Sequence, residues 1–213
     1  MGVFYFPTDF VYWKNIDEHN NFKKELLNQI ENNKQMFSET PYIDKGEGTV
    51  QNSLGLWIIE NNPTIMKTVV WNSLDALLKE LNSRPNHKPI NIKSSFISNC
   101  WFLKYNSGAT TSLHCHNDDN PSIVKNNKIY KCVFSFIYII NDDNEKNQTE
   151  FIQPTMSGTN VSERCDVRFK TSEIEDIKEG TIMIFPSSLY HQVNVMSKPN
   201  RVIFSGNIYS TFE

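Results

Sequence analysis

The sequence predicts a mainly β domain that is preceded by a helical N-terminal region. Apolar residues repeat at helical spacing in two segments before residue 90, and short β-prone runs separated by turn residues follow them. The chain has 213 residues, 38% hydrophobic and 12% aromatic, which is enough to bury a core. Eight short strands with little helix between them indicate a barrel or a sandwich. We expect one domain, 1–213, with a helical support over 1–90 and a β core over 91–213.

The N-terminal region is expected to contain two amphipathic helices. Asp17 is a plausible N-cap of the first helix. Asn62 is a plausible cap of the second, because Pro63 follows it at the first helical position. The expected elements are a strand over 3–13, a helix over 17–37, a loop over 38–53, a strand over 54–59 and a helix over 62–81.

The β core is expected to begin near residue 91. Its predicted strands cover 94–105, 110–116, 131–140, 149–153, 164–170, 181–185, 189–196 and 201–210. The breaks are rich in Gly, Asn and Asp, as in Asn106–Gly108. The polar segment 117–130 is predicted to be a long loop at the mouth of a site, because long loops in compact domains are often functional.

The composition excludes several classes of protein. A net charge of -3 without basic clusters argues against a nucleic-acid or membrane-surface binder. No apolar run approaches the roughly 18 residues of a membrane span, and the N-terminus has no signal-peptide pattern. The four cysteines are scattered without a Cys-x-x-Cys pair, which is typical of reduced thiols. We expect a cytoplasmic protein, or one in the host cytoplasm if a phage encodes it.

The segment 110–118 contains candidate metal ligands. His114, His116 and Asp118 occupy alternate positions, so an extended strand would point them to one side. Imidazole and carboxylate groups on one face suit a divalent first-row metal. The alternative is a polar strand end whose histidines contact solvent.

Two polar residues of the C-terminal third could complete such a site. His191 begins a predicted strand, and Arg201 shares one face of the last strand with Ile203 and Ser205. A buried histidine or arginine needs a partner, and an arginine fork commonly receives a carboxylate. The structural alternatives are a satisfied core histidine and a salt bridge from Arg201 to an acid at the edge of the core. Ligands at alternate positions, followed much later by one histidine and one arginine, match the arrangement of non-haem Fe(II) oxygenases.

The order of the segments resembles the Fe(II)/2-oxoglutarate-dependent dioxygenase superfamily, especially its prolyl-4-hydroxylase-like branch and the small oxygenases of bacterial and phage genomes. The resemblance covers about residues 95–210. It rests on the segments Trp101–Gly108, Phe134–Asn141, Thr149–Phe151, Gly180–His191 and Arg201–Asn207. In the last segment Ile203 replaces the serine of the family pattern.

The resemblance implies a double-stranded β-helix (jelly-roll, cupin-like) and an enzyme that uses Fe(II), 2-oxoglutarate and O₂. Such an enzyme would hydroxylate a substrate, here unidentified, and decarboxylate 2-oxoglutarate to succinate. The residues implied as metal ligands are His114, His116, Asp118 and His191, with no catalytic residue beyond them. The residues implied to bind the co-substrate are Arg201, which would hold its distal carboxylate, together with Tyr105, Tyr138 and Ser205.

The metal motif departs from the usual His-x-Asp of the family and allows two registers. The spacing from Tyr105 and Gly108 makes His114 and His116 the pair, with Asp118 as a substitute or outer ligand. The preference of Fe(II) for a carboxylate makes His116 and Asp118 the pair. We favour the first register, and His116 belongs to both.

Two other functions fit the same residues. One is a cupin-like metalloprotein that does not use 2-oxoglutarate, and the other is a non-enzymatic β-sandwich binding module. For the oxygenase we expect a small-molecule or peptide substrate and no nucleic-acid or membrane partner. The sequence does not predict the substrate or the oligomeric state.

Overall fold

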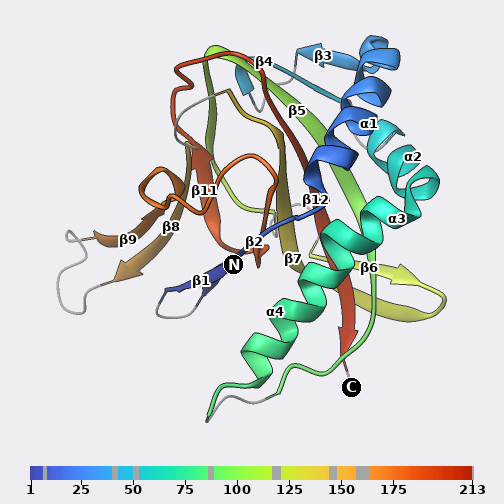
Figure 1. Cartoon of the computed structure of the whole chain (residues 1–213). Coiled ribbons are helices and arrows are strands. Elements are labelled where there is room, and N and C mark those ends of the chain that lie inside the picture. Colours follow the sequence, from blue (N-terminus) through green and yellow to red (C-terminus); the bar gives the residue numbers. More distant parts are fainter. Residues whose placement is uncertain are drawn as a thin grey trace.

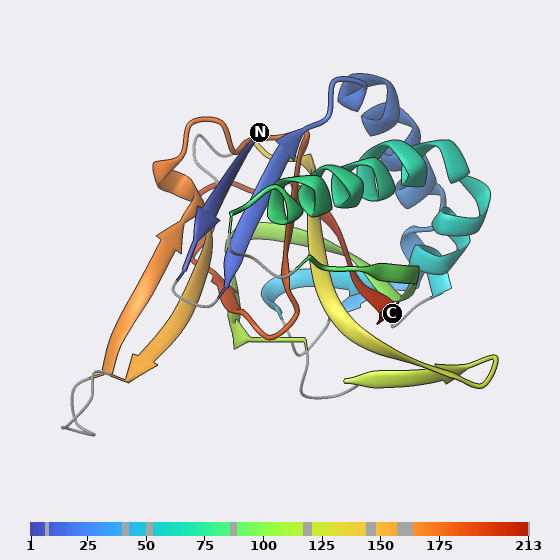
Figure 2. The same ribbon diagram turned by 90° about the horizontal axis from the view of Figure 1, so that it is seen from below.

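The computed structural model describes residues 1–6, 9–39, 43–49, 53–85, 89–116, 121–143, 148–156 and 164–212. The helices lie together on one side of a large, curved antiparallel sheet (Figure 1). The view from below shows the helices stacked along one side of the strands (Figure 2). The predicted mainly β class is therefore confirmed. None of the helices in these ranges has the length and hydropathy that crossing a membrane requires.

The N-terminal region contributes strands as well as helices. Its elements are β1 (Gly2–Tyr5), β2 (Phe10–Asn15), α1 (His19–Asn32), a 3₁₀ turn (Lys34–Met36), β3 (Phe37–Glu39), β4 (Ile43–Thr49), α2 (Ser53–Asn61), α3 (Pro63–Met66), a π-helical turn (Lys67–Trp71) and α4 (Asn72–Asn82). Both predicted helices are present, and the second is divided by the π-helical turn. Asn62 is at the predicted N-cap position, but its side chain bonds to Gln29 and Ile58 and not to the helix that it precedes.

The prediction of a strand over 54–59 is wrong, because this segment is helix α2. A short apolar run is compatible with a strand and with a buried helix, and only tertiary contacts decide between them. Here a Cβ atom on Gly55 would lie 2.6 Å from the Cys100 carbonyl oxygen, so glycine lets the helix backbone approach the sheet closely. The predicted loop over 38–53 likewise contains the two short strands β3 and β4.

The described residues of the C-terminal region form strands and one short 3₁₀ turn (Thr171–Glu173). The strands are β5 (Ile92–His114), β6 (Ser122–Lys125), β7 (Lys128–Asn141), β8 (Thr149–Met156), β9 (Arg164–Lys170), β10 (Thr181–Pro186), β11 (Tyr190–Val193) and β12 (Arg201–Phe212). The first two predicted strands are one, because the chain continues through Gly108, which has a φ of 79°. The predicted loop 117–130 contains β6 and a two-residue turn at Asn126 and Asn127, both at positive φ, so it is partly a β-hairpin.

The strands form one sheet in the order β1-β2-β10-β7-β12-β5-β11-β8-β9, with β4 on β5, β3 on β4 and β6 on β7. The last strand, β12, is therefore a central strand, paired with β7 on one edge and β5 on the other. The N-terminal strand β2 extends the sheet by pairing with β10. The N-terminal region thus adds to the sheet and also covers it.

The two faces of the sheet bury different clusters. On the helix-covered face Tyr138 and Phe204 join a core that includes Leu26, Ile30, Leu74, Leu77 and Leu81. On the other face, which we call the inner face, Ile137 and Ile139 join a core that includes Tyr105, Phe151, Phe185 and Ile203. Alternation along β7 thus assigns successive residues to opposite faces.

Leu77 tests the contact between helix and sheet. Its side chain is fully buried in α4, so Leu77→Ala should lower the free energy of unfolding by about 2–5 kcal/mol. Urea denaturation followed by circular dichroism measures the change. Lys79→Ala, at an exposed position of the same helix, is the matched control and should change stability by less than about 0.5 kcal/mol. Equal effects of the two substitutions would contradict the role of α4 as a covering layer.

Candidate metal centre

Three histidines meet at one end of the inner face. His114 is the last residue of β5, and the antiparallel register places it opposite His191 of β11. His116 follows the end of β5, where its backbone N–H donates a hydrogen bond to the Ser187 carbonyl oxygen at 2.8 Å. Each ring offers a nitrogen, and these nitrogens all lie within 4.8 Å of one another. The structure therefore brings together three of the four residues expected as metal ligands.

Backbone carbonyl groups orient two of the three rings. The His114 Nδ1 lies 2.8 Å from the Ser112 carbonyl oxygen, and the His191 Nδ1 lies 3.2 Å from that of Leu189. Because a carbonyl oxygen can only accept, each Nδ1 carries the proton and each Nε2 keeps its lone pair. The Nε2 atoms of His116 and His191 are only 3.2 Å apart. This arrangement suits one cation between nitrogen lone pairs, with the carbonyl groups fixing the ring tautomers.

Burial keeps the imidazole groups neutral. It lowers the pKa of His116 to about 3, with a further contribution from the nearby His114. Burial also lowers the pKa of His191 well below its ordinary value, and the other two histidines add to this effect. The pKa of His114 is lowered by burial as well, although the hydrogen bond to Ser112 opposes the change. Neutral imidazole is the form that ligates a metal, so the group is ready to bind one at neutral pH.

Aromatic side chains lie beside His191 and His116. The ring centre of His191 lies 4.9 Å from that of Phe185 and 5.8 Å from that of Phe151. The indole of Trp101, on β5, is centred 5.2 Å from the ring of His116. Such a shell limits the access of water and lowers the local dielectric constant. Three neutral nitrogen donors in this setting fit Fe(II) and neighbouring first-row divalent ions.

Arg201 forms a second polar position, at the start of β12. It is fully buried and pairs with Tyr105 of β5, whose ring centre lies 5.3 Å from the guanidinium carbon. Its Nη2 donates to the Thr149 hydroxyl at 2.8 Å, and its Nη1 lies 3.8 Å from the Met196 sulfur. A hydroxyl, a thioether and a ring face are weak partners for a guanidinium, whose two terminal nitrogens match a carboxylate.

Arg201 also has an internal carboxylate partner. Its Nε lies 3.6 Å from Asp142 Oδ2, and both side chains are buried. This is the salt bridge to a core-edge acid that a purely structural role of Arg201 predicts. This distance is longer than the about 2.7–2.9 Å of a charge-assisted hydrogen bond. The Asp142 carboxylate compensates the buried charge of Arg201 at the Nε side of the guanidinium.

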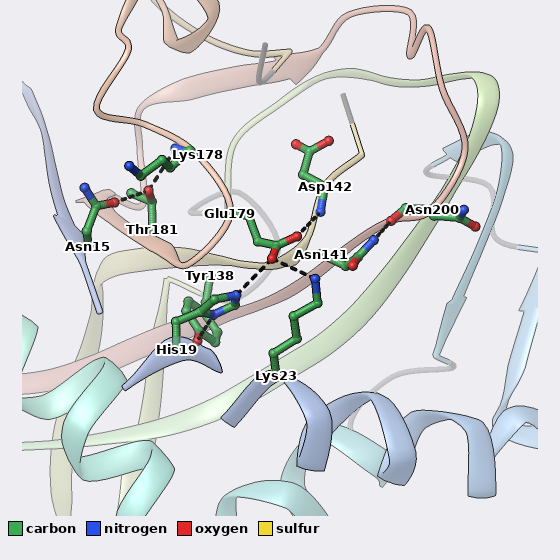
Figure 3. Close-up of polar contacts among 10 residues, drawn as sticks. All are labelled: Asn15, His19, Lys23, Tyr138, Asn141, Asp142, Lys178, Glu179, Thr181 and Asn200. Atoms are coloured by element: carbon green, nitrogen blue, oxygen red, sulfur yellow. Dashed lines mark hydrogen bonds and ion pairs between the residues drawn. The ribbon is translucent and has the colours of Figure 1, made fainter. Parts of the chain in front are cut away.

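The remaining residues of the predicted site lie in different places. Tyr138 is on the helix-covered face, where its hydroxyl lies 2.7 Å from His19 Nδ1 (Figure 3). Tyr105, and not Tyr138, is therefore the tyrosine beside Arg201. Ser205 is buried on β12, directly opposite Trp101 in the register. Asp118 lies outside the described residues.

Three residues that contact Arg201 were not among the predicted site residues: Thr149, Met196 and Asp142. Thr149 could have been found, because alternation with Phe151 puts its hydroxyl on the inner face of a predicted strand. Asp142 had no comparable pattern, because it occurs in a polar turn and meets Arg201 only through the tertiary fold.

Comparison with solved structures identifies the fold. OsALKBH1 superimposes with a TM-score of 0.61 at 14% identity, over 97% of this chain and 99% of that one. The non-haem α-ketoglutarate-dependent carbocyclase SnoK, from nogalamycin biosynthesis, superimposes with a TM-score of 0.55 at 10% identity. The match covers 94% of this chain and 79% of SnoK. A prolyl hydroxylase from Trichoplax adhaerens, in complex with a peptide of hypoxia inducible factor, superimposes with a TM-score of 0.53 at 14% identity. The match covers 92% of this chain and 82% of that one.

The chain therefore has the double-stranded β-helix fold found in these oxygenases, as the sequence resemblance predicts. No protein-family model matches the sequence, and no curated protein does. Because the identities are 10–14%, the structural likeness establishes the fold, and the activity has to be inferred from the residues of the site.

Thr149 tests the contact that orients Arg201. Thr149→Val keeps the side-chain shape but removes the acceptor of Nη2, which should lower the free energy of unfolding by about 1–3 kcal/mol. Thermal and urea denaturation measure the change. Thr211→Val is the matched control, because the Thr211 hydroxyl is buried and has no hydrogen-bond partner among the described residues. The control should be neutral or stabilising, and a Thr149→Val protein as stable as the control would contradict the proposed strength of the contact.

Proposed function

We propose that this protein is an Fe(II)- and 2-oxoglutarate-dependent dioxygenase that hydroxylates a small-molecule or peptide substrate. The observation that carries the proposal is the group of three imidazole nitrogens within 4.8 Å on the inner face of a double-stranded β-helix. The buried Arg201 on the same sheet supplies a receptor for the distal carboxylate of 2-oxoglutarate. SnoK, which is α-ketoglutarate-dependent and non-haem, shares this fold and supports the assignment.

Each residue has a defined role in this proposal. His114, His116 and His191 would hold the metal, with Asp118 as a further or substitute ligand. Arg201, assisted by Thr149 and Tyr105, would orient the 2-oxoglutarate carboxylate, and Ser205 would face the same interior. When bound, the iron and 2-oxoglutarate activate O₂ for oxidation of a C–H bond and release succinate. The protein itself positions the groups and keeps the interior dry.

The setting of the histidines supports the proposed substrate class. Trp101 and the loop after β10, which holds Ser187 against His116, are the described groups next to the metal site. They offer an aromatic face and a backbone carbonyl group, whereas Asp118 lies outside the described residues. The similar structures include a hydroxylase bound to a peptide and a carbocyclase of a small-molecule pathway. A neutral small molecule or peptide segment fits this setting, in a cytoplasmic protein with reduced thiols.

Metal binding tests the histidine group directly. Nickel(II), which resists oxidation, should bind once per chain and quench tryptophan fluorescence, because Trp101 lies beside His116. His191→Ala should weaken the nickel affinity by more than about 100-fold. Loss of a group that only hydrogen-bonds to a metal ligand already lowers metal affinity by about 10–100-fold. Calorimetry and fluorescence titration measure the change. His19→Ala, a buried histidine on the other face, is the matched control and should keep the affinity.

The same titration distinguishes the two ligand registers. Loss of affinity in His114→Ala with little change in Asp118→Asn supports the pair His114 and His116. The opposite result supports the pair His116 and Asp118. Binding that survives both His116→Ala and His191→Ala would refute the metal site.

Turnover of 2-oxoglutarate tests the activity. Protein with Fe(II), ascorbate and 2-oxoglutarate should form succinate slowly without substrate, and His191→Ala should abolish this. Arg201→Met should lose succinate formation but keep metal binding, because the metal ligands come from other strands. Metal-dependent activity that survives Arg201→Met would favour a cupin-like enzyme without 2-oxoglutarate. A wild-type protein that binds no metal would favour a non-enzymatic module.

A further inference from the structure

Two carboxamide side chains lie opposite each other on the inner face. Asn207 of β12 is directly paired with Asn99 of β5, and the register between these strands is unbroken from Arg201 to Asn207. Because side chains alternate along a strand, Asn99 shares the face of Trp101. Asn207 likewise shares the face of Ser205. Directly opposite residues of an antiparallel pair have Cβ atoms about 4.5–5.5 Å apart, so the two carboxamide groups adjoin each other.

The Asn207 carboxamide is fixed in orientation through its oxygen. Its Oδ1 accepts a hydrogen bond from the Ser135 hydroxyl of β7 at 2.8 Å. The Ser135 hydroxyl also lies 3.0 Å from Ser187 Oγ. Ser187 is the residue whose carbonyl oxygen accepts from the His116 backbone N–H at 2.8 Å. The orientation of Asn207 is thus connected through two serines to the segment that carries a candidate metal ligand.

The nitrogen of Asn207 is available for a ligand. Asn207 is 5% exposed, yet among the residues that the structure describes its Nδ2 donates no hydrogen bond. Asn99 is half-buried, and within the same ranges its carboxamide bonds to no other group, including Asn207. A buried polar group without a partner is costly, so such a pair is favourable where a ligand or water supplies the partner. The pair therefore has the properties of a binding site.

The available groups of the pair match an amide. Asn207 offers N–H donors, because its oxygen already accepts from Ser135. Asn99 offers both donors and an acceptor. An amide carries a carbonyl oxygen and an N–H on adjacent atoms, so one amide can accept from Asn207 and donate to Asn99. An anion would use only the donors and a cation only the acceptor, whereas an uncharged amide uses both.

Trp101 connects the carboxamide pair to the histidines. It is two residues from Asn99 on the same face of β5, which corresponds to about 7 Å along the strand. Its ring centre lies 5.2 Å from that of His116. The pair is therefore one side chain away from the histidine group, within reach of a substrate that is bound at the metal.

We propose that Asn99 and Asn207 form a substrate subsite that binds an uncharged amide group next to the metal centre. The inference deepens the proposed function and rests on it. Asn207 donates to the amide carbonyl oxygen, and Asn99 accepts from the amide N–H. The amide belongs either to a peptide backbone or to a carboxamide of a small molecule, and the two sources share this recognition chemistry.

Two amide probes of different origin test the subsite on the metal-free protein. N-acetylalanine N-methylamide represents a peptide, and benzamide represents a small molecule. Methyl benzoate is the matched ester, which keeps the carbonyl oxygen and lacks the N–H. Saturation-transfer NMR titrations measure the affinities. The wild type should bind benzamide at least about fivefold more tightly than methyl benzoate, which is the effect of one neutral hydrogen bond. The amide that binds more tightly identifies the source.

Isosteric substitutions assign the binding to the pair. Asn99→Leu and Asn207→Leu remove the hydrogen-bonding groups at similar side-chain volume, and each should weaken amide binding by about fivefold or more. Asn99→Leu breaks no side-chain hydrogen bond within the described ranges, so it decides the question if Asn207→Leu, which deprives Ser135 of an acceptor, does not fold. Asn21→Leu makes the same change at an exposed position of α1 and should leave both affinities unchanged.

Manganese(II) locates the bound amide. This ion is paramagnetic and speeds the relaxation of protons close to it. In the manganese-loaded wild type the protons of the bound probe should relax faster than in the metal-free protein, and His191→Ala should remove the difference. A probe that binds without faster relaxation in the manganese-loaded protein would refute a substrate subsite.

The outcomes separate this inference from the proposed function. If the wild type binds metal and 2-oxoglutarate, but no amide binds or both leucine variants bind the amides as tightly, only the subsite is refuted. If amide binding depends on Asn99 and Asn207 but the protein forms no succinate, the amide-binding pair is supported and the proposed function fails. Asparagine also recognises adenine. Adenosine that binds more tightly than both amides, with the same dependence on Asn207, would refute the assignment to an amide.

Discussion

Strand β5 keeps β4 along one edge and exchanges its partner along the other. Up to Tyr105 it pairs with β12, and from Thr111 it pairs with β11. Between these stretches the chain bends at Gly108, whose N–H donates to the Met196 carbonyl oxygen at 2.8 Å. The exchange places the start of β12, with Arg201, and the start of β11, with His191, beside one continuous strand. Both polar positions of the site depend on this single pairing arrangement.

The helix-covered face of the sheet is packed with apolar residues, and the inner face carries the polar residues of the candidate site. The helices bury the apolar residues of one face, and the inner face can therefore carry histidines, an arginine and hydroxyl groups among aromatic rings. The three imidazoles are kept neutral by burial, and the Arg201 guanidinium lies 3.6 Å from the Asp142 carboxylate. The inner face thus combines a compensated ion pair with a group of neutral donors, which avoids the cost of isolated buried charge.

Alternation along the strands predicted that His114 and His116 share one side and that Arg201 shares a face with Ile203 and Ser205, whereas His191 was added from the order of the segments and the family resemblance. A period of two along β5 and β12 depends only on strand geometry, and the structure follows it at His114, Arg201 and Ser205. The helix at 53–61 could not be predicted, because its apolar run is ambiguous until Gly55 meets Cys100. Asp142 could not be predicted either, since the antiparallel pairing of β7 with β12 is what brings it near Arg201. Tyr138 was a candidate beside Tyr105 but was equally compatible with core packing, and the structure places the two tyrosines in different core clusters.

The central place of β12 in the sheet has a consequence for folding during synthesis. Ribosomes make β5 and β7 long before β12, yet β12 is the strand that lies between them. Until it arrives, both strands present unpaired backbone edges, which are prone to join edges of other chains. The sheet closes only after the C-terminal segment has left the ribosome, so folding depends on contacts distant in sequence and is expected to be slow. The candidate site, with ligands on early and late strands, is therefore assembled at the final stage of folding.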